Sequence, residues 1–161
     1  MTMDTETTTE IRPAAAKDLA AIEALLTANG LPTDGVPECL DGFLVAEHGG
    51  AIVGVVGVER CCSEYGLLRS TAVDAAWRGH GVGRRLVARA IAEAEARGTK
   101  ALYLLTMTAE RYFPSFGFVP TTREQVPAEV RATAEFCSIC PSTSTVMSLE
   151  LGLNESARCA L

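Results

Sequence analysis

The feature that most constrains this chain is a strand, a glycine-rich loop, a helix and a second strand, in that order, in its middle. Residues 65–74, "YGLLRSTAVD", are mainly apolar, and "RGHGVG" follows at 78–83. Residues 84–98 then place apolar side chains on one helical face, and 100–107 form another apolar run. Such a unit buries the apolar face of its helix against a sheet that contains both strands. The sequence therefore predicts an α/β fold, a central sheet with helices on its faces.

The rest of the chain adds strands and one more helix around this unit. The predicted elements are a strand at 10–14, a helix at 19–29 capped by Asp18, a hairpin with arms at 43–47 and 51–59, a short helix within 109–118 and a last strand at 143–151. The second hairpin arm is apolar at nearly every position, so we expect both of its faces to be covered.

Length and composition fit a single domain, which we place at residues 10–151. The chain has 161 residues, 48% of them hydrophobic, and this is enough for a core. The acidic, threonine-rich residues 1–9 are expected to form a disordered tail, and 152–161 a C-terminal tail. The start lacks the pattern of a signal peptide, and no apolar run approaches the roughly 20 residues of a membrane span, so we expect a cytoplasmic protein. The formal net charge of -6 argues against a nucleic-acid partner.

The glycine loop predicts a site for a phosphate-bearing cofactor. The first N–H groups of a helix have no partner within it, and they carry the positive end of its dipole. Glycines allow a ligand to approach the backbone closely, and arginines add charge. The loop is not a P-loop, and it is a poor match to the dinucleotide fingerprint. The candidate cofactor-binding residues are Arg78, Gly79, His80, Gly81, Val82, Gly83 and Arg84, with Arg85 adding a further positive charge.

These residues resemble a known family. "RGHGVG" fits the pattern [Q/R]-x-x-G-x-[G/A] of the GCN5-related N-acetyltransferases (GNAT), and "ALYLLT" followed by "AERYFPSFGF" is similar to that family's next strand and its A-x-x-F-Y-x-x-x-G-F segment. The resemblance covers about residues 10–151. It implies a mostly antiparallel sheet of about seven strands flanked by about four helices. It also implies acetyl-CoA as cosubstrate, with its pyrophosphate on the loop and its pantetheine arm along Ala72 and Val73.

A closer likeness concerns the acceptor. The segments "LLRSTAV", "LYLLTMTAERYF" and "VPAEVRATAEF" resemble the acetyltransferases encoded in arsenic-resistance operons. This likeness implies an enzyme that acetylates the amine of a small, amino-acid-like substrate, arsenical and phosphinate compounds included, by direct attack on the thioester. Many members of the family are dimers, so a second copy of the chain, in a homodimer, is a possible partner, although no surface pattern in the sequence indicates one.

The resemblance implies an acid, for which Tyr112 is the candidate. The family's proton donor is the second aromatic of its F-Y pair, whereas here Tyr112 takes the first place and Phe113 the second. A shift of one helical residue turns a side chain by about 100°. A thiol has a pKa of about 8.5, so the thiolate can also leave without a dedicated donor.

For the base we favour Glu59, at the end of the second hairpin arm. It would act through water or attract the substrate ammonium; the alternative is an exposed charge at a strand end. Glu64 and His48 are weaker candidates, His48 because it lies in the hairpin turn.

Arg69 is the candidate substrate-binding residue. It lies in an otherwise apolar strand, where an unpaired charge costs several kcal/mol. Its partner is either an oxyanion of the substrate, held bidentately, or an internal carboxylate such as Glu59. Arg123 and Arg131 are candidates for a second anionic contact.

The cysteines support a rival hypothesis. In a cytoplasmic chain they are expected to be thiols rather than disulfides; Cys137 and Cys140 form one C-x-x-C, but no second pair at zinc-finger spacing accompanies it, so no metal site is predicted. A thiol-based arsenic- or metal-binding protein with a vestigial or regulatory CoA site is the alternative, and an acetyltransferase of protein amines ranks last. The six cysteines are Cys39, Cys61, Cys62, Cys137, Cys140 and Cys159.

Overall fold

The computed structural model describes residues 9–33, 35–60, 64–106, 113–133 and 145–151. The strands are β1 (Glu10–Pro13), β2 (Phe43–His48), β3 (Ala51–Arg60), β4 (Tyr65–Val73), β5 (Ala101–Thr106), β6 (Val119–Thr121) and β7 (Thr145–Glu150). The α-helices in these ranges are α2 (Leu19–Ala28), α3 (Val82–Ala96) and α4 (Ala128–Arg131). Short 3₁₀ helices lie at Ala16–Asp18, Pro37–Gly42, Ala75–Trp77, Phe113–Phe116 and Arg123–Gln125.

The strands form one seven-stranded sheet in the order β1-β2-β3-β4-β5-β7-β6. β4 and β5 pair in parallel, as expected for two strands joined through a helix. The pairs β1–β2, β2–β3, β5–β7 and β6–β7 are antiparallel. The predicted fold class, a mostly antiparallel mixed sheet of about seven strands with helices, is confirmed.

In the described ranges the predicted strands and helices are present, and β6, α4 and several 3₁₀ helices are additional. α3 begins at Val82, two residues before the predicted periodic run. β6 and α4 were not predicted, because three residues of strand and four of helix are too few to show a periodicity. No helix in the described ranges is both long enough and apolar enough to cross a membrane.

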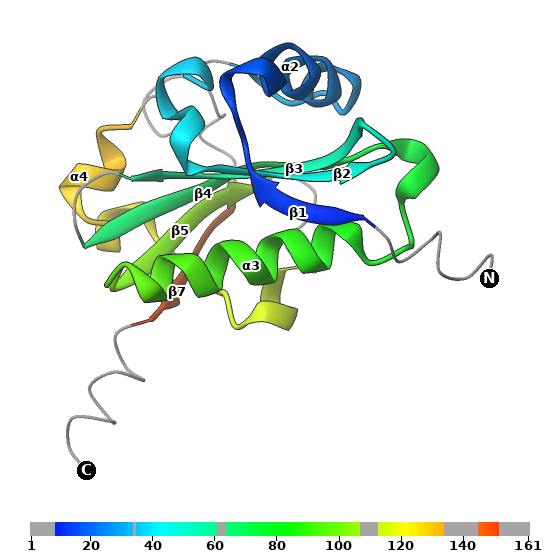
Figure 1. Ribbon diagram of the computed structural model, residues 1–161. Coiled ribbons are helices and arrows are strands. Elements are labelled where there is room, and N and C mark those ends of the chain that lie inside the picture. The colour runs from blue at the N-terminus through cyan, green and yellow to red at the C-terminus, as the bar shows by residue number, and fades with distance from the viewer. Residues whose placement is uncertain (1–8, 34, 61–63, 107–112, 134–144, 152–161) are drawn as a thin grey trace. The chain divides into compact units, whose positions relative to one another are not determined.

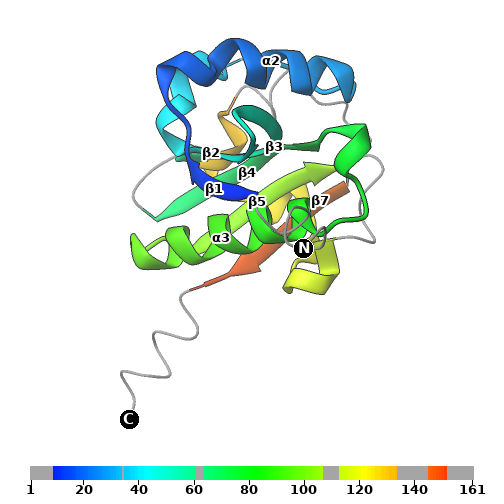
Figure 2. The same ribbon diagram turned by 45° about the vertical axis from the view of Figure 1, so that its right-hand side comes forward.

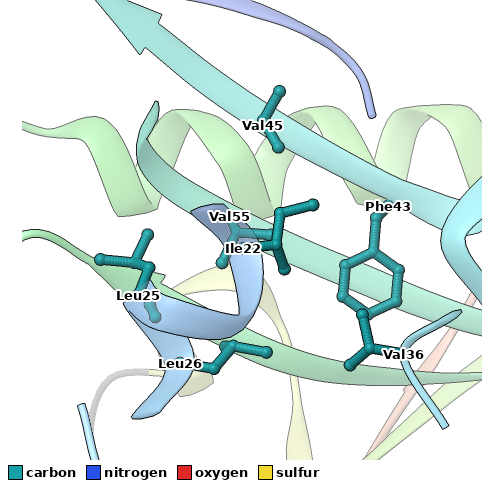
Figure 3. Close-up of a cluster of buried hydrophobic side chains, with 8 residues drawn as sticks. Ile22, Leu25, Leu26, Val36, Phe43, Val45 and Val55 are labelled. Atoms are coloured by element: carbon teal, nitrogen blue, oxygen red, sulfur yellow. The ribbon is translucent and has the colours of Figure 1, made fainter. Parts of the chain in front are cut away.

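The chain divides into two compact units, which we describe separately. Unit 1 comprises residues 1–58 and 70–90, and unit 2 comprises 59–69 and 91–161. The core of unit 1 joins α2 to β2 and β3. Ile22 and Leu26 of α2 are fully buried, as are Val45 and Val55 of the strands, and Figure 3 shows these side chains pointing toward one another. Burial of this apolar face is what stabilises a ten-residue helix.

Within unit 1, α2 and the beginning of α3 cover opposite faces of the strands (Figures 1 and 2). Val55 faces the α2 core, whereas the neighbouring Gly54 faces Val82 and Leu86 of α3. Successive strand residues point to opposite faces, so β3 is covered on both sides, as its continuous apolar run predicts.

In unit 2 a separate core joins β4, β5, β7 and the segment around α4. Leu67 and Val130 are fully buried, with Val126 and Val146 beside them. Tyr65 and Tyr103 flank this core with their rings edge to face, 6.2 Å between centroids. Burial raises the pKa of the Tyr103 hydroxyl above its ordinary value.

Asp18 precedes α2, but its side chain does not cap that helix. Its carboxylate instead accepts hydrogen bonds from the guanidinium of Arg12, at 2.9 and 3.1 Å, and from the N–H of Ala15, at 2.7 Å. Arg12 also donates to Glu47 at 2.7 Å. The predicted capping role was therefore wrong, because a cation on β1 competes for the carboxylate. The resulting network ties β1 to β2 and to the start of α2.

Replacing Asp18 with asparagine should destabilise the protein in a pH-dependent way. The hydrogen bonds from Arg12 lower the pKa of Asp18 to about 2. This carboxylate therefore stabilises the fold above its unfolded pKa, and the contribution is lost as the pH falls toward 2. We expect a loss of about 1 to 2 kcal/mol at pH 7, since Arg12 is partly exposed and solvent screens the pair. Urea unfolding of the wild type and the variant between pH 7 and 2 measures this loss. If the difference between their free energies of unfolding stays constant over this range, the ionised Asp18 carboxylate does not stabilise the fold.

Candidate functional site

The glycine loop forms a tight path from the end of β4 to the start of α3. Asp74 accepts a hydrogen bond from the N–H of Ala76 at 2.9 Å and so begins the 3₁₀ turn after the strand. Gly79 and Gly81 then adopt φ values of 83° and 81°. Only glycine reaches this left-handed region without strain. α3 follows directly, and its first backbone bond runs from the N–H of Arg85 to the carbonyl of Gly81, at 3.0 Å.

This geometry has the features that an anion site at the start of a helix requires. The first turn of α3 presents backbone N–H groups, and the helix dipole places partial positive charge there. Apart from each glycine and its chain neighbours, no atom of the described residues lies within 4 Å of the positions that Cβ atoms would take at Gly79 and Gly81, so the backbone there is open to a ligand. Gly83 differs from these two glycines: it lies inside the helix and has no positive φ.

Two of the arginines grouped with this site hold the loop in place. Arg78 donates to the carbonyl of Val73 at 3.3 Å and to the side-chain oxygen of Asn29, the residue that ends α2. Arg85 donates to the carbonyl of Thr9 at 2.9 Å and to its hydroxyl. Thr9 is buried, although the sequence analysis assigned it to the tail. Arg84, at the start of the helix, is exposed, as are Arg78 and Arg85.

A row of aromatic rings fixes the other end of the loop. The ring of Trp77 lies 4.7 Å from that of His48, in the β2–β3 hairpin, and 5.8 Å from that of His80, in the loop. No local sequence pattern connects these three residues, and His48 was predicted only to lie in the hairpin turn. The sequence feature that could have indicated a role for Trp77 is its position: the chain's one tryptophan directly precedes Arg78.

The strand end predicted to hold the pantetheine arm lies just beyond a backbone irregularity. Ser70 has a φ of 60°, the one positive φ at a non-glycine residue in the described ranges. Such a conformation costs about 1 to 3 kcal/mol, and it persists where the surrounding structure imposes it. Ala72 is buried and Val73 half-buried two and three residues further on.

In unit 2, Arg69 and Glu59 form an ion pair. A guanidinium nitrogen of Arg69 lies 3.1 Å from a carboxylate oxygen of Glu59, and the two side chains are 1% and 21% exposed. Two kinds of partner were considered for Arg69, a substrate oxyanion and an internal carboxylate. In the structure Arg69 pairs with the internal carboxylate of Glu59. Glu59 is not a solitary strand-end charge. The weaker candidate Glu64 instead forms an exposed pair with Lys100 at 3.2 Å.

Several candidates lie outside the described residues. These are Tyr112, Cys61, Cys62, Cys137, Cys140 and Cys159. Phe113, the residue that takes the tyrosine's place, is buried and packs edge-on against Phe118 at 5.8 Å. Cys39 is half-buried. In the part of the chain that the structure describes, no three His, Cys, Asp or Glu side chains gather in a way that could hold a metal ion.

Comparison with curated proteins points to amino-acid acetyltransferases. The chain is 34% identical over 96 residues to an amino-acid acetyltransferase of Mycobacterium tuberculosis, a match to 58% of this chain and 55% of that protein. It is 33% identical over 90 residues to an amino-acid acetyltransferase of Ectopseudomonas mendocina, a match to 55% of this chain and 21% of that protein. The chain thus spans about half of the first relative's length and a fifth of the second's.

Solved structures share the fold over most of the chain. A Mycobacterium tuberculosis protein in complex with CoA superposes with a TM-score of 0.76 and 26% identity, covering 88% of this chain and 99% of that one. N-acetylglutamate synthase of Neisseria gonorrhoeae, complexed with coenzyme A and N-acetyl-glutamate, gives a TM-score of 0.76 at 22% identity, covering 89% of this chain and 35% of that one. A model of the GNAT acetyltransferase domain matches residues 40–120, just over half of the chain, and the chain therefore belongs to the GNAT acetyltransferase family.

Proposed function

We propose that this chain transfers the acetyl group of acetyl-CoA to the amino group of a small, amino-acid-like acceptor. The observation that carries the proposal is the open backbone at Gly79 and Gly81, directly before the first turn of α3. Membership of the family supports acetyl-CoA as the cosubstrate. The relatives named as amino-acid acetyltransferases support the acceptor class.

The residues of unit 1 fit the phosphate-bearing cosubstrate. The N–H groups of Gly79 to Arg84 would bind the pyrophosphate, and the exposed Arg84 adds charge at the same helix start. The tethers formed by Arg78, Arg85 and Trp77 hold the loop in its conformation before the ligand binds, which lowers the entropic cost of binding. Backbone groups at Ala72 and Val73 would orient the pantetheine arm. When bound, acetyl-CoA supplies an acetyl group activated as a thioester.

The reaction requires the acceptor amine in its neutral form. Its nitrogen lone pair forms the new C–N bond, the C–S bond breaks, and one ammonium proton has to leave. We assign that proton to Glu59, directly or through water. Arg69 then acts as a positioning residue: its buried guanidinium fixes the Glu59 carboxylate, and with 1% exposure it offers little surface to an acceptor. That Tyr112 donates a proton to the leaving CoA thiolate stays a prediction.

Trp77 provides a direct test of cosubstrate binding. As the chain's single tryptophan, one residue before the loop, it should change its fluorescence when CoA binds. We expect a saturable change with CoA and with acetyl-CoA, together with a higher melting temperature, since a ligand of the folded state stabilises it. The Trp77→Phe variant should lose the optical signal and keep the thermal shift. The absence of both the fluorescence change and the thermal shift at millimolar CoA would refute the proposed function.

The acceptor class is tested by a screen for CoA release. The panel should contain glutamate, glutamine and other amino acids, with their phosphinate and arsenical analogues, because the resemblance noted above points to these anionic amines. Turnover should be highest with a free α-amine next to an anionic group and absent with N-blocked versions of the same compounds. Binding of CoA without turnover of any amino-acid-type amine would refute the acceptor class and leave the cosubstrate assignment intact.

A further inference from the structure

Gly54 lies where the beginning of α3 crosses β3. It is buried near the middle of the strand and pairs with Ala46 of β2. A Cβ atom at this position would lie 2.8 Å from Cδ1 of Leu86 and 2.9 Å from Cγ1 of Val82. Nonbonded carbon atoms prefer about 3.5 to 4.0 Å. The first turns of α3 therefore rest on bare strand backbone.

The contact concerns the part of α3 that presents the anion-binding N–H groups. Val82 is the first residue of the helix and Leu86 lies one turn later, at 2% and 0% exposure. Val82 is stiff about χ1 because it is branched at Cβ, and both side chains are buried, so little free space is left for them to rotate into. A methyl group at position 54 must push the helix start outward. The loop before it is held at Trp77 and Arg78, so that displacement has to deform the loop.

We propose that Gly54 is a positioning residue for the cosubstrate: its missing side chain sets how close the first turn of α3 lies to β3, and thereby the placement of the N–H groups that bind pyrophosphate. This inference rests on the proposed function. It assigns an effect on CoA affinity to a residue that lies in a strand, outside the loop itself.

Gly57 of the same strand is the matched control. It is also buried, but a Cβ there would overlap the ring of Phe43, which belongs to the core on the α2 face. Residues 54 and 57 lie three apart, hence on opposite faces of the strand. Alanine at either position crowds unit 1, yet only alanine at position 54 crowds the start of α3.

The experiment measures the dissociation constant of CoA, by Trp77 fluorescence, and urea unfolding for each variant. Gly54→Ala should weaken CoA binding at least tenfold. Gly57→Ala should keep the dissociation constant within about twofold of the wild type, even where its loss of stability is equal or larger. Adding Val82→Ala to Gly54→Ala removes one of the two atoms that the new methyl meets most closely, and it should recover part of the lost affinity while the backbone N–H of residue 82 is retained.

The outcomes separate the two proposals. If the wild type fails to bind CoA, the proposed function itself is wrong. If the wild type binds and Gly54→Ala binds equally well, the role of Gly54 is overturned. Equal losses of affinity in Gly54→Ala and Gly57→Ala, or no recovery in the double variant, would also overturn it, because the effect would then be general destabilisation.

Discussion

Replacing Arg69 with methionine should lower the free energy of unfolding by about 3 kcal/mol. The guanidinium is 1% exposed and lies 3.1 Å from the Glu59 carboxylate, which is itself 21% exposed. Methionine keeps much of the side-chain volume and removes the charge, so Glu59 keeps its desolvation cost but loses this cation. Removing one partner of a buried ion pair typically costs about 3 to 5 kcal/mol, and the partial exposure of Glu59 places the expectation at the lower end.

The control is the neighbouring exposed arginine, Arg60→Met, which should change stability by less than about 0.5 kcal/mol. The double variant Arg69→Met with Glu59→Leu should be more stable than Arg69→Met alone, because it also removes the carboxylate that has lost this cation. Urea unfolding at constant m-value measures all four proteins. If Arg69→Met unfolds like the wild type, the ion pair does not stabilise the fold.

The same pair makes a catalytic prediction. If Arg69 orients Glu59, then Arg69→Lys, which keeps the charge but not the planar guanidinium, should lower kcat about tenfold or more. The dissociation constant of CoA should stay within about twofold, since the loop that we propose binds it belongs to unit 1. A selective rise in KM for the acceptor with unchanged kcat would instead favour direct contact between Arg69 and the substrate.

Local patterns in the sequence were sufficient to predict the fold and the position of the glycine loop between β4 and α3. The apolar run of β4, the glycines after it and the periodicity of α3 lie within 35 residues, so chain neighbours alone define them. The hairpin of β2 and β3 is likewise local, with Gly49 and Gly50 both at positive φ in its turn.

What the sequence did not reveal depends on contacts between distant residues. The partner of Arg69 was left open, because several carboxylates were available and only the pairing of strands selects Glu59. Trp77 meets His48 across 29 positions of the chain, and Arg78 meets Asn29 across 49. Asp18 was predicted to cap a helix because it directly precedes a helical pattern in the sequence, whereas its partner in the structure, Arg12, lies on a strand. Gly54 looked like one member of an apolar run, and its role depends on a helix that begins 28 residues later.

Replacing Gly81 with valine should weaken CoA binding at least a hundredfold. Gly81 has a φ of 81°, which is a strained conformation for a residue with a branched Cβ. No atom lies within 4 Å of the position of its Cβ, so the variant can fold, at a cost of about 1 to 2 kcal/mol in backbone strain. Either the valine keeps the loop conformation and occupies the space of the pyrophosphate, or the loop relaxes and its N–H groups no longer converge.

Gly98, at the other end of α3, is the matched control. It has a φ of 85°, again with no atom within 4 Å of its Cβ position, and it ends the helix through its N–H bond to the carbonyl of Glu95. Gly98→Val should therefore cost a similar amount of stability and leave the CoA dissociation constant unchanged. Gly83→Ala, inside the helix and without positive φ, should not strain the backbone. If Gly81→Val and Gly98→Val weaken CoA binding equally, the loss follows from helix stability, and the anion site has to be sought away from the start of α3.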